Sequence, residues 1–295
     1  MKLYVGRFLM KPAFFVSLHF VYQVSVIMNP KHIVITGSTR GIGLGLARAF
    51  LALGHYVSIS GRHRESVNAV SRKLQQEFNS DRVAGFVVDV TVPRSINQLW
   101  LKASLWKPID IWVNNAGIGQ SNNVFTHIHP EEIDGVIHTN LVGLMNGTRV
   151  AYLHMKQQGH GAIYNMEGFG SDGQMMSGMT LYGTTKRAAR YFTRSFAKEI
   201  ENREILLGTL SPGMVVTDLL LDSVKKAPEE HQRSIKIFNM LADRVETVTP
   251  FLARKILENR KNDIHIVWLT TFRLMIRFLL SVLRKRTVIF EDDLN

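Results

Sequence analysis

The chain has 295 residues, of which 45% are hydrophobic, and its formal net charge is +12. This composition excludes a disordered chain and is sufficient for one α/β domain or two small ones. The lack of cysteine excludes disulfide scaffolds, thiolate metal sites and cysteine nucleophiles. The basic residues are scattered without interleaved aromatic residues, so we expect no nucleic-acid partner, and the histidines lack the spacing of a metal site.

Residues 1–30 form a basic, apolar extension before the first predicted strand. The extension carries Lys2, Arg7 and Lys11 without any acidic residue, and it is almost uncharged from Ala13 to Met28. Such a stretch is typical of a signal peptide or a short anchor, although it is short for a membrane span and no small-residue cleavage motif follows it. An equal alternative is a misassigned start, with Met28 as the natural first residue.

From residue 31 to 269, short β-branched runs alternate with helix-length segments. This alternation predicts right-handed crossovers and a single Rossmann-like α/β domain, whose doubly wound parallel sheet carries helices on both faces. No proline-rich linker divides the region. The predicted strands are Ile33–Thr36, Tyr56–Ser60, Val83–Val88, Ile109–Val113, Ile163–Asn165, Ile205–Leu210 and Ile264–Leu269.

Three helices and one irregular segment matter for the site. The helices are predicted at Gly41–Leu53, Pro130–Gln158 and Thr180–Asn202 from their apolar periodicity. The segment 219–244 is charged and contains no predicted strand. Because it follows the sixth strand at the ligand-binding edge, we interpret it as a lid over the substrate.

Residues 270–295 form a basic tail after the last predicted strand. In its first half, Leu274, Phe278 and Leu279 are interrupted by Arg273 and Arg277. Arginines within an apolar helix favour a position in the membrane interface over a span of the bilayer. We therefore expect an amphipathic helix in peripheral contact with a membrane, and a membrane-associated or cytoplasmic protein. A helix packed on the core is the alternative.

A glycine-rich segment connects the first predicted strand to the first helix. A strand that turns through glycines into a helix N-terminus can hold phosphate groups, so this segment predicts a nucleotide cradle. Its residues are Thr36, Gly37, Ser38, Thr39, Arg40, Gly41, Ile42 and Gly43.

Two further turns follow the third and fourth predicted strands. They end at the same carboxyl edge of the sheet, where ligands bind in such folds, and their small residues leave room for adenine and ribose. The expected cofactor contacts there are Asp89, Val90, Asn115, Ala116 and Gly117.

The end of the second strand indicates which dinucleotide binds. An acid there would bond the 2′-hydroxyl of NAD, but this chain has Arg62 at that place. Together with Arg40 of the glycine segment, Arg62 can bind a 2′-phosphate, which favours NADPH as the cofactor.

Tyr182 and Lys186 lie four residues apart on a predicted helix and so project from one face. A free phenol has a pKa near 10, and a neighbouring ammonium lowers it. We therefore expect Tyr182 to be the general acid of a carbonyl reduction, with Lys186 as its activator.

These segments together resemble the short-chain dehydrogenase/reductase family. The resemblance rests on T-G-x-x-x-G-I-G at Thr36–Gly43, N-N-A-G at Asn114–Gly117, Y-x-x-x-K at Tyr182–Lys186 and P-G-x-V-x-T at Pro212–Thr217. It implies that Asn140 holds a water in a proton relay to Lys186, and that the chain forms a homo-dimer or homo-tetramer. It also implies that the nicotinamide carboxamide binds to Pro212, Gly213, Val215 and Thr217.

One position departs from that family's pattern. The family carries a serine about thirteen residues before the tyrosine to hold the substrate oxygen, and alignment on the strand puts Gly168 there. Ser171 is the candidate replacement, whereas Glu167 could stabilise an oxyanion only when protonated.

The sequence around the departure resembles the chlorophyll b reductase subgroup of plants. The similar segments are Asn165–Gly173, Tyr182–Arg187 and Leu210–Leu220. The resemblance implies reduction of the 7-formyl group of chlorophyll b to a hydroxymethyl group. A reductase of acyl, steroid or sphingoid-base carbonyls is the alternative enzyme, and a catalytically silent NADP(H)-binding sensor is the alternative from another class.

Overall fold

The computed structural model describes residues 29–121, 123–225, 231–283 and 286–289, with side chains described except at 222–234 and 282–285. Residues 1–30 and 31–295 form two separate units, and the fold below belongs to the second. The expected anchor or signal segment falls within residues 1–30, and residues 1–28 of it lie outside the described residues. None of the described helices is long and apolar enough to cross a membrane.

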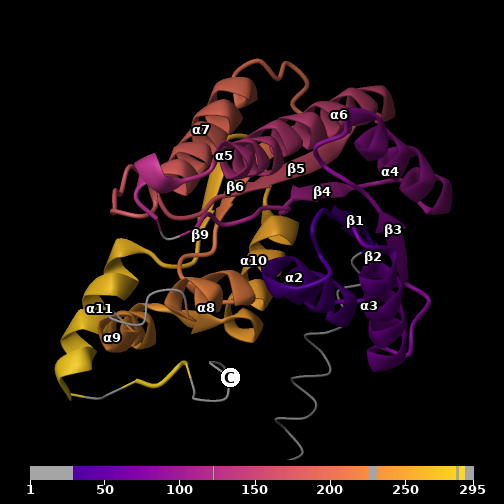
Figure 1. Ribbon diagram of the computed structural model, residues 1–295. Helices are drawn as coiled ribbons and strands as arrows, with labels where there is room; N and C mark the ends of the chain where they lie inside the picture. Colours follow the sequence, from indigo (N-terminus) through magenta and orange to yellow (C-terminus); the bar gives the residue numbers. More distant parts are fainter. Residues whose placement is uncertain (1–28, 122, 226–230, 284–285, 290–295) are drawn as a thin grey trace, which may run out of the picture. The chain divides into compact units, whose positions relative to one another are not determined.

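A seven-stranded sheet forms the centre of the domain (Figure 1). Its strand order is β3-β2-β1-β4-β5-β6-β9, and each neighbouring pair is parallel. The predicted doubly wound parallel sheet is therefore confirmed, and each predicted strand overlaps an observed one. The strands are β1 His32–Ile35, β2 Tyr56–Gly61, β3 Val83–Val87, β4 Ile111–Asn114, β5 Gly161–Met166, β6 Ile205–Ser211 and β9 Ile264–Val267.

Helices cover both faces of this sheet, α4, α6 and α7 on one side and α2, α3 and α10 on the other (Figure 1). Successive residues of a strand point to opposite faces, so Ile33 and Ile35 enter one core and Val34 enters the other. Burial on both faces explains why these strands read as continuous apolar runs. The helices are α2 Gly41–Ala52, α3 Arg64–Glu77, α4 Pro93–Trp106, α5 Pro130–Ile137, α6 Gly143–Gln158, α7 Thr180–Ala197 and α10 Val245–Glu258.

The helix predicted at Pro130–Gln158 is observed as α5 and α6, joined by a π-helical turn, His138–Val142 (η2). Such turns insert one extra residue per turn into a helix and are frequent at functional sites. The turn contains Asn140 and directs its buried side chain toward α7, where it bonds Thr185. Periodicity alone does not reveal this turn, because the apolar pattern runs through it.

The candidate lid is helical and ends in a short strand. It comprises α8 Asp218–Lys225, α9 His231–Leu241 and β8 Asp243–Arg244, and β8 pairs with β7 Val215–Val216. The expectation that this segment contains no strand was wrong at its end, because a two-residue bridge leaves no periodic signal in the sequence. Ile289 of the tail packs with Ala242 in a small apolar cluster, so the lid and the tail share a core.

Asn165 anchors a buried polar network beneath the carboxyl edge of the sheet. Its Oδ1 accepts hydrogen bonds from Asn114 Nδ2 at 2.8 Å and Thr148 Oγ1 at 3.1 Å. Its Nδ2 donates to Thr193 Oγ1 at 2.8 Å. One side chain thus links β4, β5 and α6 to α7, the helix that carries Tyr182 and Lys186.

Replacing Asn165 by alanine removes three buried hydrogen bonds, although each of the three partners keeps one other bond. Each lost bond contributes about 0.5–1.5 kcal/mol and the buried volume left empty adds to the loss, so we expect the free energy of unfolding to fall by at least about 2 kcal/mol. Urea unfolding followed by circular dichroism measures it. Asn68→Ala, on the exposed face of α3, is the matched control and should change stability by less than about 0.5 kcal/mol. Equal stabilities of the two variants would contradict the importance of the network.

Candidate active site

The glycine segment forms a tight cradle at the start of α2. Gly37 has a φ of 61°, and a Cβ added there would lie 2.7 Å from the Cα of Ala116. Only glycine tolerates this conformation and this close approach of two backbones. The first turn of α2 begins at Gly41, so its free N–H groups face the cradle and can bind phosphate.

The turn after β4 is fastened to this cradle. Thr36 Oγ1 accepts hydrogen bonds from the backbone N–H of Asn115 at 3.0 Å and of Ala116 at 3.1 Å. In return, Asn115 Nδ2 donates to the carbonyls of Thr36 at 2.9 Å and Gly37 at 2.8 Å. The glycine segment and the turn after β4 are therefore fastened to each other. They lie between β1 and β4, where the strand order reverses and a dinucleotide can bind.

Two of the predicted cofactor residues use their side chains to shape the loops. Ser38 Oγ donates to the carbonyl of Ile35 at 2.7 Å and accepts from the N–H of Ser60 at 2.8 Å, and it is fully buried. Asp89 Oδ1 accepts from the N–H and hydroxyl of Thr91 at 2.9 and 2.7 Å. Both residues hold the cleft in shape, so any contact they make with a cofactor comes from the backbone or from the second oxygen of Asp89.

The two arginines of the cofactor prediction lie at this edge on separate loops. Arg62 is exposed directly after β2. Arg40 Nη1 lies 3.4 Å from Asp218 Oδ2, and both side chains are exposed. An exposed pair of this kind contributes about 0–1 kcal/mol, so a phosphate can compete with Asp218 for Arg40.

The Pro212–Thr217 segment runs over the cradle from the end of β6. Pro212 and Val215 are buried, and a Cβ added at Gly41 would lie 3.5 Å from Thr217 Cγ2. Thr217 therefore lies next to the start of α2. The structure brings this predicted cofactor segment and the glycine segment to one cleft.

Tyr182 and Lys186 project from α7 into the same region. Lys186 Nζ donates to the carbonyl of Met166 at 3.3 Å and lies 5.5 Å from the centre of the Tyr182 ring. A Cβ added at Gly117 of the cofactor turn would lie 3.6 Å from Lys186 Nζ. The predicted pair is thus brought together beside the predicted cofactor cleft.

The protonation of this pair differs from the sequence expectation. Burial raises the pKa of Tyr182 to about 12, whereas we expected Lys186 to lower it. Burial also lowers the pKa of Lys186 to about 8, and the negative charge of Glu167 partly opposes that shift. Desolvation dominates because both groups lie in a site of low dielectric, which spacing along a helix does not reveal. At neutral pH the pair is a neutral phenol beside an ammonium.

Asn140 contacts the turn after β4 through its whole side-chain amide. Its Oδ1 accepts from the N–H of Ile118 at 2.8 Å, and its Nδ2 donates to the carbonyl of Ile118 at 2.9 Å and to Thr185 Oγ1 at 3.3 Å. Asn140 therefore ties α7 to the cofactor turn. Its implied role in a water relay stays a prediction.

Gly168 lies against the phenol of Tyr182. A Cβ added at Gly168 would lie 2.4 Å from Tyr182 Oη and 3.2 Å from Lys186 Cε. Real Cβ atoms do not approach other atoms that closely, so the tyrosine hydroxyl occupies the space of the side chain that the family's serine would have here. Glycine at 168, in place of the family's serine, and the position of the Tyr182 hydroxyl therefore depend on each other.

Ser171, the candidate replacement for that serine, is hydrogen-bonded to Glu167. Its Oγ donates to Glu167 Oε2 at 3.0 Å, and its carbonyl accepts from Arg187 Nη1 at 3.0 Å. Ser171 is buried. It would have to leave the carboxylate before it could bond a substrate oxygen.

Glu167 is a buried carboxylate with basic partners. His265 Nε2 lies 3.1 Å from its Oε2, and Arg190 Nε lies 3.6 Å from its Oε1. Burial alone raises the pKa of this carboxyl, but hydrogen bonds from His265 and Thr209 and electrostatic interactions with His265 and Arg190 outweigh it and lower the pKa. Glu167 is therefore ionised in the neighbourhood of Lys186. Sequence analysis missed His265 and Arg190, since nothing in β9 or in the second half of α7 marks them as neighbours of Glu167.

The model of the short chain dehydrogenase family matches residues 31–228. The chain belongs to the short-chain dehydrogenase family. It is 34% identical over 275 residues to the probable chlorophyll(ide) b reductase NYC1 of Oryza sativa, covering 87% of this chain and 53% of the relative. It is 36% identical over 243 residues to chlorophyll(ide) b reductase NOL of the same plant, covering 80% and 69%. The chain thus spans about half the length of the NYC1 relatives.

A solved structure named ElxO with NADP bound has the same fold. Its TM-score is 0.72 at 23% identity, covering 83% of this chain and 99% of the other. The sequence-based assignment to this family, with a resemblance to chlorophyll b reductases, is confirmed.

Replacing Gly168 by serine should damage the site instead of restoring a family feature. The added Cβ forces Tyr182 out of its position, so we expect a loss of about 1–3 kcal/mol in stability and a displaced phenol ring. Thermal unfolding and a crystal structure of the variant measure the two effects. Gly135→Ser in α5, where the nearest atom to an added Cβ is 3.9 Å away, is the control and should be neutral. An unmoved Tyr182 in a stable Gly168→Ser protein would contradict the argument.

Proposed function

We propose that the protein is an NADPH-dependent oxidoreductase that reduces a carbonyl group of a bulky hydrophobic substrate. The observation that carries the proposal is the position of Tyr182 and Lys186 beside a glycine cradle fastened to the turn after β4. An acid and a cation next to a dinucleotide cleft suit the delivery of a proton to a carbonyl oxygen.

The cleft fits a dinucleotide phosphate. A side chain at Gly37 would clash with Ala116 of the neighbouring turn, and the N-terminus of α2 faces the cradle. Arg40 and Arg62 are exposed on the two loops at its edge, and two cations there suit a 2′-phosphate. NADPH, when bound, would supply the hydride. The proposed contacts are those of the glycine segment, of the turns after β3 and β4, and of Pro212–Thr217.

Tyr182 holds the proton that the reaction needs. Its raised pKa keeps the phenol neutral at physiological pH, so a proton is available at Oη. As the proton leaves, the phenolate that forms is stabilised by the Lys186 ammonium, whose charge is in turn sustained by Glu167. The carbonyl of Met166 orients Lys186.

Apolar side chains around the site favour a hydrophobic substrate. The segments that follow β4 and β6 expose Phe125 and Leu219, respectively. The curated relatives NYC1 and NOL are named chlorophyll(ide) b reductases. The best candidate reaction is therefore reduction of the 7-formyl group of chlorophyll b to a hydroxymethyl group.

The assembly and location form part of the same proposal. A groove of about 930 Å³ runs along α7 on the side that carries Tyr191 and Phe192, away from Tyr182, and methionines line it. This groove supports a homo-dimer or homo-tetramer through the long helices. A peripheral membrane contact suits a substrate that partitions into lipid, and the tail is its proposed element.

An assay of the purified protein with NADPH tests the function. The carbonyl panel contains chlorophyll b, a long-chain aldehyde and a steroid ketone, with NADPH oxidation and product chromatography as readouts. We expect 7-hydroxymethyl chlorophyll from the first. Turnover of the aldehyde or the ketone alone would move the assignment to the alternative reductase, and tight NADPH binding without any turnover would contradict the enzyme and favour the sensor.

Arg62→Asp should change the preference between the two dinucleotides. A carboxylate at the end of β2 repels a 2′-phosphate and bonds a 2′-hydroxyl, so the ratio of kcat/KM for NADPH to that for NADH should fall at least about tenfold. Arg64→Asp, at the exposed first residue of α3, is the control. An unchanged ratio in Arg62→Asp would remove this residue from the proposal.

The pH dependence of reduction should follow Lys186. Below its pKa of about 8 the side chain is an ammonium, so kcat/KM should be constant there and fall as the pH rises through about 8. Glu167→Gln removes a charge that raises this pKa and should move the fall to lower pH, whereas Ser171→Ala keeps the carboxylate and should leave it in place. Superimposable profiles for Glu167→Gln and the parent protein would refute the coupling.

A further inference from the structure

The C-terminal helix α11, Thr271–Leu283, exposes its apolar side chains. Phe272 and Leu279 are each 70% exposed, and Phe278 is 54% exposed. Helices of a folded domain normally turn such residues toward the core and their arginines toward water. The other exposed large apolar residues of this helix are Met275, Ile276 and Leu280.

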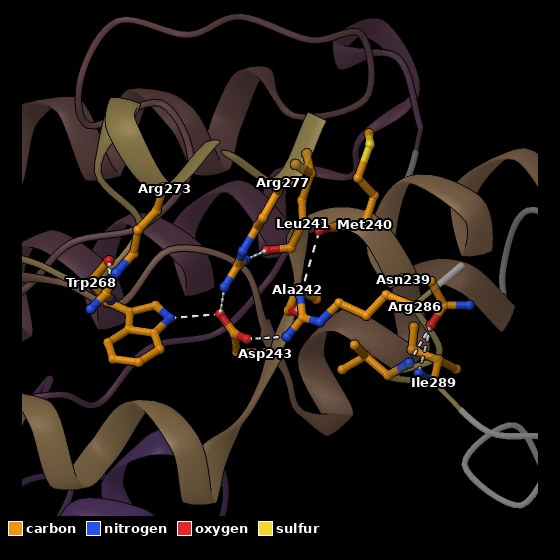
Figure 2. Close-up of polar contacts among 11 residues, drawn as sticks. Asn239, Met240, Leu241, Ala242, Asp243, Trp268, Arg273, Arg277, Arg286 and Ile289 are labelled. Atoms are coloured by element: carbon orange, nitrogen blue, oxygen red, sulfur yellow. Dashed lines mark hydrogen bonds and ion pairs between the residues drawn. The ribbon is translucent and has the colours of Figure 1, made fainter. Parts of the chain in front are cut away.

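The arginines of the same helix point into the domain (Figure 2). Arg277 Nη1 donates to the carbonyl of Leu241 at 2.6 Å, and its Nη2 bonds Asp243 Oδ2 at 2.5 Å. Arg273, one turn earlier, donates to the carbonyl of Trp268 at 2.6 Å and stacks on the Trp268 ring at 3.9 Å. The sequence expectation that these arginines would interrupt a lipid-facing surface was wrong, because they occupy the opposite face.

Asp243 is the point on which these contacts converge. Its side chain is 2% exposed, and its carboxylate also accepts from Trp268 Nε1 at 2.6 Å and pairs with Arg286, which follows the helix. A buried carboxylate with two arginines is satisfied only while both remain in place, and removal of a partner is costly. The cluster therefore fixes the rotation of α11 about its axis and keeps the apolar face outward.

We propose that this outward face of α11 inserts into the surface of an anionic lipid bilayer. The inference rests on the proposed membrane contact and names the surface that makes it. Insertion removes the exposed Phe, Leu, Met and Ile side chains from water. The inward contacts of Arg277 with Asp243 and of Arg273 with Trp268 keep both arginines from opposing it.

The positive charge of this segment favours anionic lipid as the binding partner of the outward face. Between Thr270 and Thr287 the sequence has five cationic residues and no acidic one. Three of them, Arg273, Arg277 and Arg286, bond the domain, and the other two, Arg284 and Lys285, directly follow the apolar stretch in a chain whose net charge is +12. Basic residues that flank an apolar surface are attracted to anionic headgroups. A bilayer surface offers both the apolar interior and the negative charge that this segment requires.

The same contacts connect α11 to the lid. Arg277 and Arg286 bond the carbonyls of Leu241 and Ala242 at the end of α9, and Asn239 Oδ1 accepts from the N–H groups of Val288 and Ile289 at 2.7 and 2.8 Å. Docking of α11 would therefore bring the lid to the bilayer surface, where a lipid-soluble substrate is concentrated.

A single fluorescent label tests the surface directly. The chain has no cysteine, so Leu279→Cys provides one labelling site for an environment-sensitive dye on α11. Leu105→Cys on α4 is the matched control, because Leu105 is 87% exposed on another helix. Vesicles contain phosphatidylcholine with phosphatidylglycerol and, in a parallel sample, doxyl-labelled lipid as a quencher.

With vesicles, we expect the emission at position 279 to shift to shorter wavelength and to be quenched by doxyl lipid, and the emission at 105 to stay as in buffer. An emission at 279 that stays as in buffer would overturn the proposal. A blue shift at 279 that rises with protein concentration without vesicles would also overturn it, by assigning the face to a second copy of the chain. The readout needs no turnover, so it is independent of the reductase proposal.

A second measurement gives the strength of insertion. Phe278→Ser combined with Leu279→Ser should lower the partition coefficient onto the same vesicles at least about tenfold, since each side chain buried contributes about that factor or more. Leu105→Ser should leave it unchanged. Thermal unfolding and NADPH binding establish that the variants fold, and an unchanged partition coefficient in the double variant would contradict the proposal.

Discussion

The close approach of Tyr182 Oη to Gly168 constrains the whole active site. Because the phenol occupies the space of a side chain at 168, this position in the loop after β5 has room only for glycine while Tyr182 stays in place. Glu167 and Ser171 bond each other in that loop, and both are buried. Tyr182, the proposed proton donor, is therefore the first candidate to hydrogen-bond the substrate oxygen.

Burial sets the electrostatics of this site more than spacing does. Two groups four residues apart on α7 are desolvated together, which raises the pKa of Tyr182 and lowers that of Lys186. The ionised Glu167 behind them limits the second shift. A neutral acid next to a cation is the arrangement that a reduction requires, since the donor must carry its proton when the carbonyl arrives.

The sequence predicted the elements whose signals are local. The strands appear as apolar runs because both faces of the sheet are covered, and the glycine segment is apparent because only glycine fits beside Ala116. The π-helical turn at Asn140 was not predictable, since one extra residue in a helical turn does not disturb the apolar pattern. The partners of Glu167 come from α7 and β9, which only the folded sheet brings together.

The tail is a second case in which a contact distant in the sequence could not be predicted from local periodicity. Periodicity identifies an amphipathic helix after Thr270, but it does not indicate which face meets the domain. Asp243, which precedes the helix by about 30 residues, determines which face meets the domain through its pairs with Arg277 and Arg286. A buried charge can determine which face of a helix meets the domain, because leaving that charge unpaired is costly.

The central claim is that Tyr182 donates the proton in a carbonyl reduction. Its most direct test is Tyr182→Phe, measured for NADPH affinity and for single-turnover reduction of the best substrate found in the panel. The account predicts that reduction is lost by a factor of at least about 100 while the dissociation constant for NADPH changes little, because the phenol oxygen is the only atom removed. A Tyr182→Phe protein that reduces the carbonyl at the parent rate would contradict it.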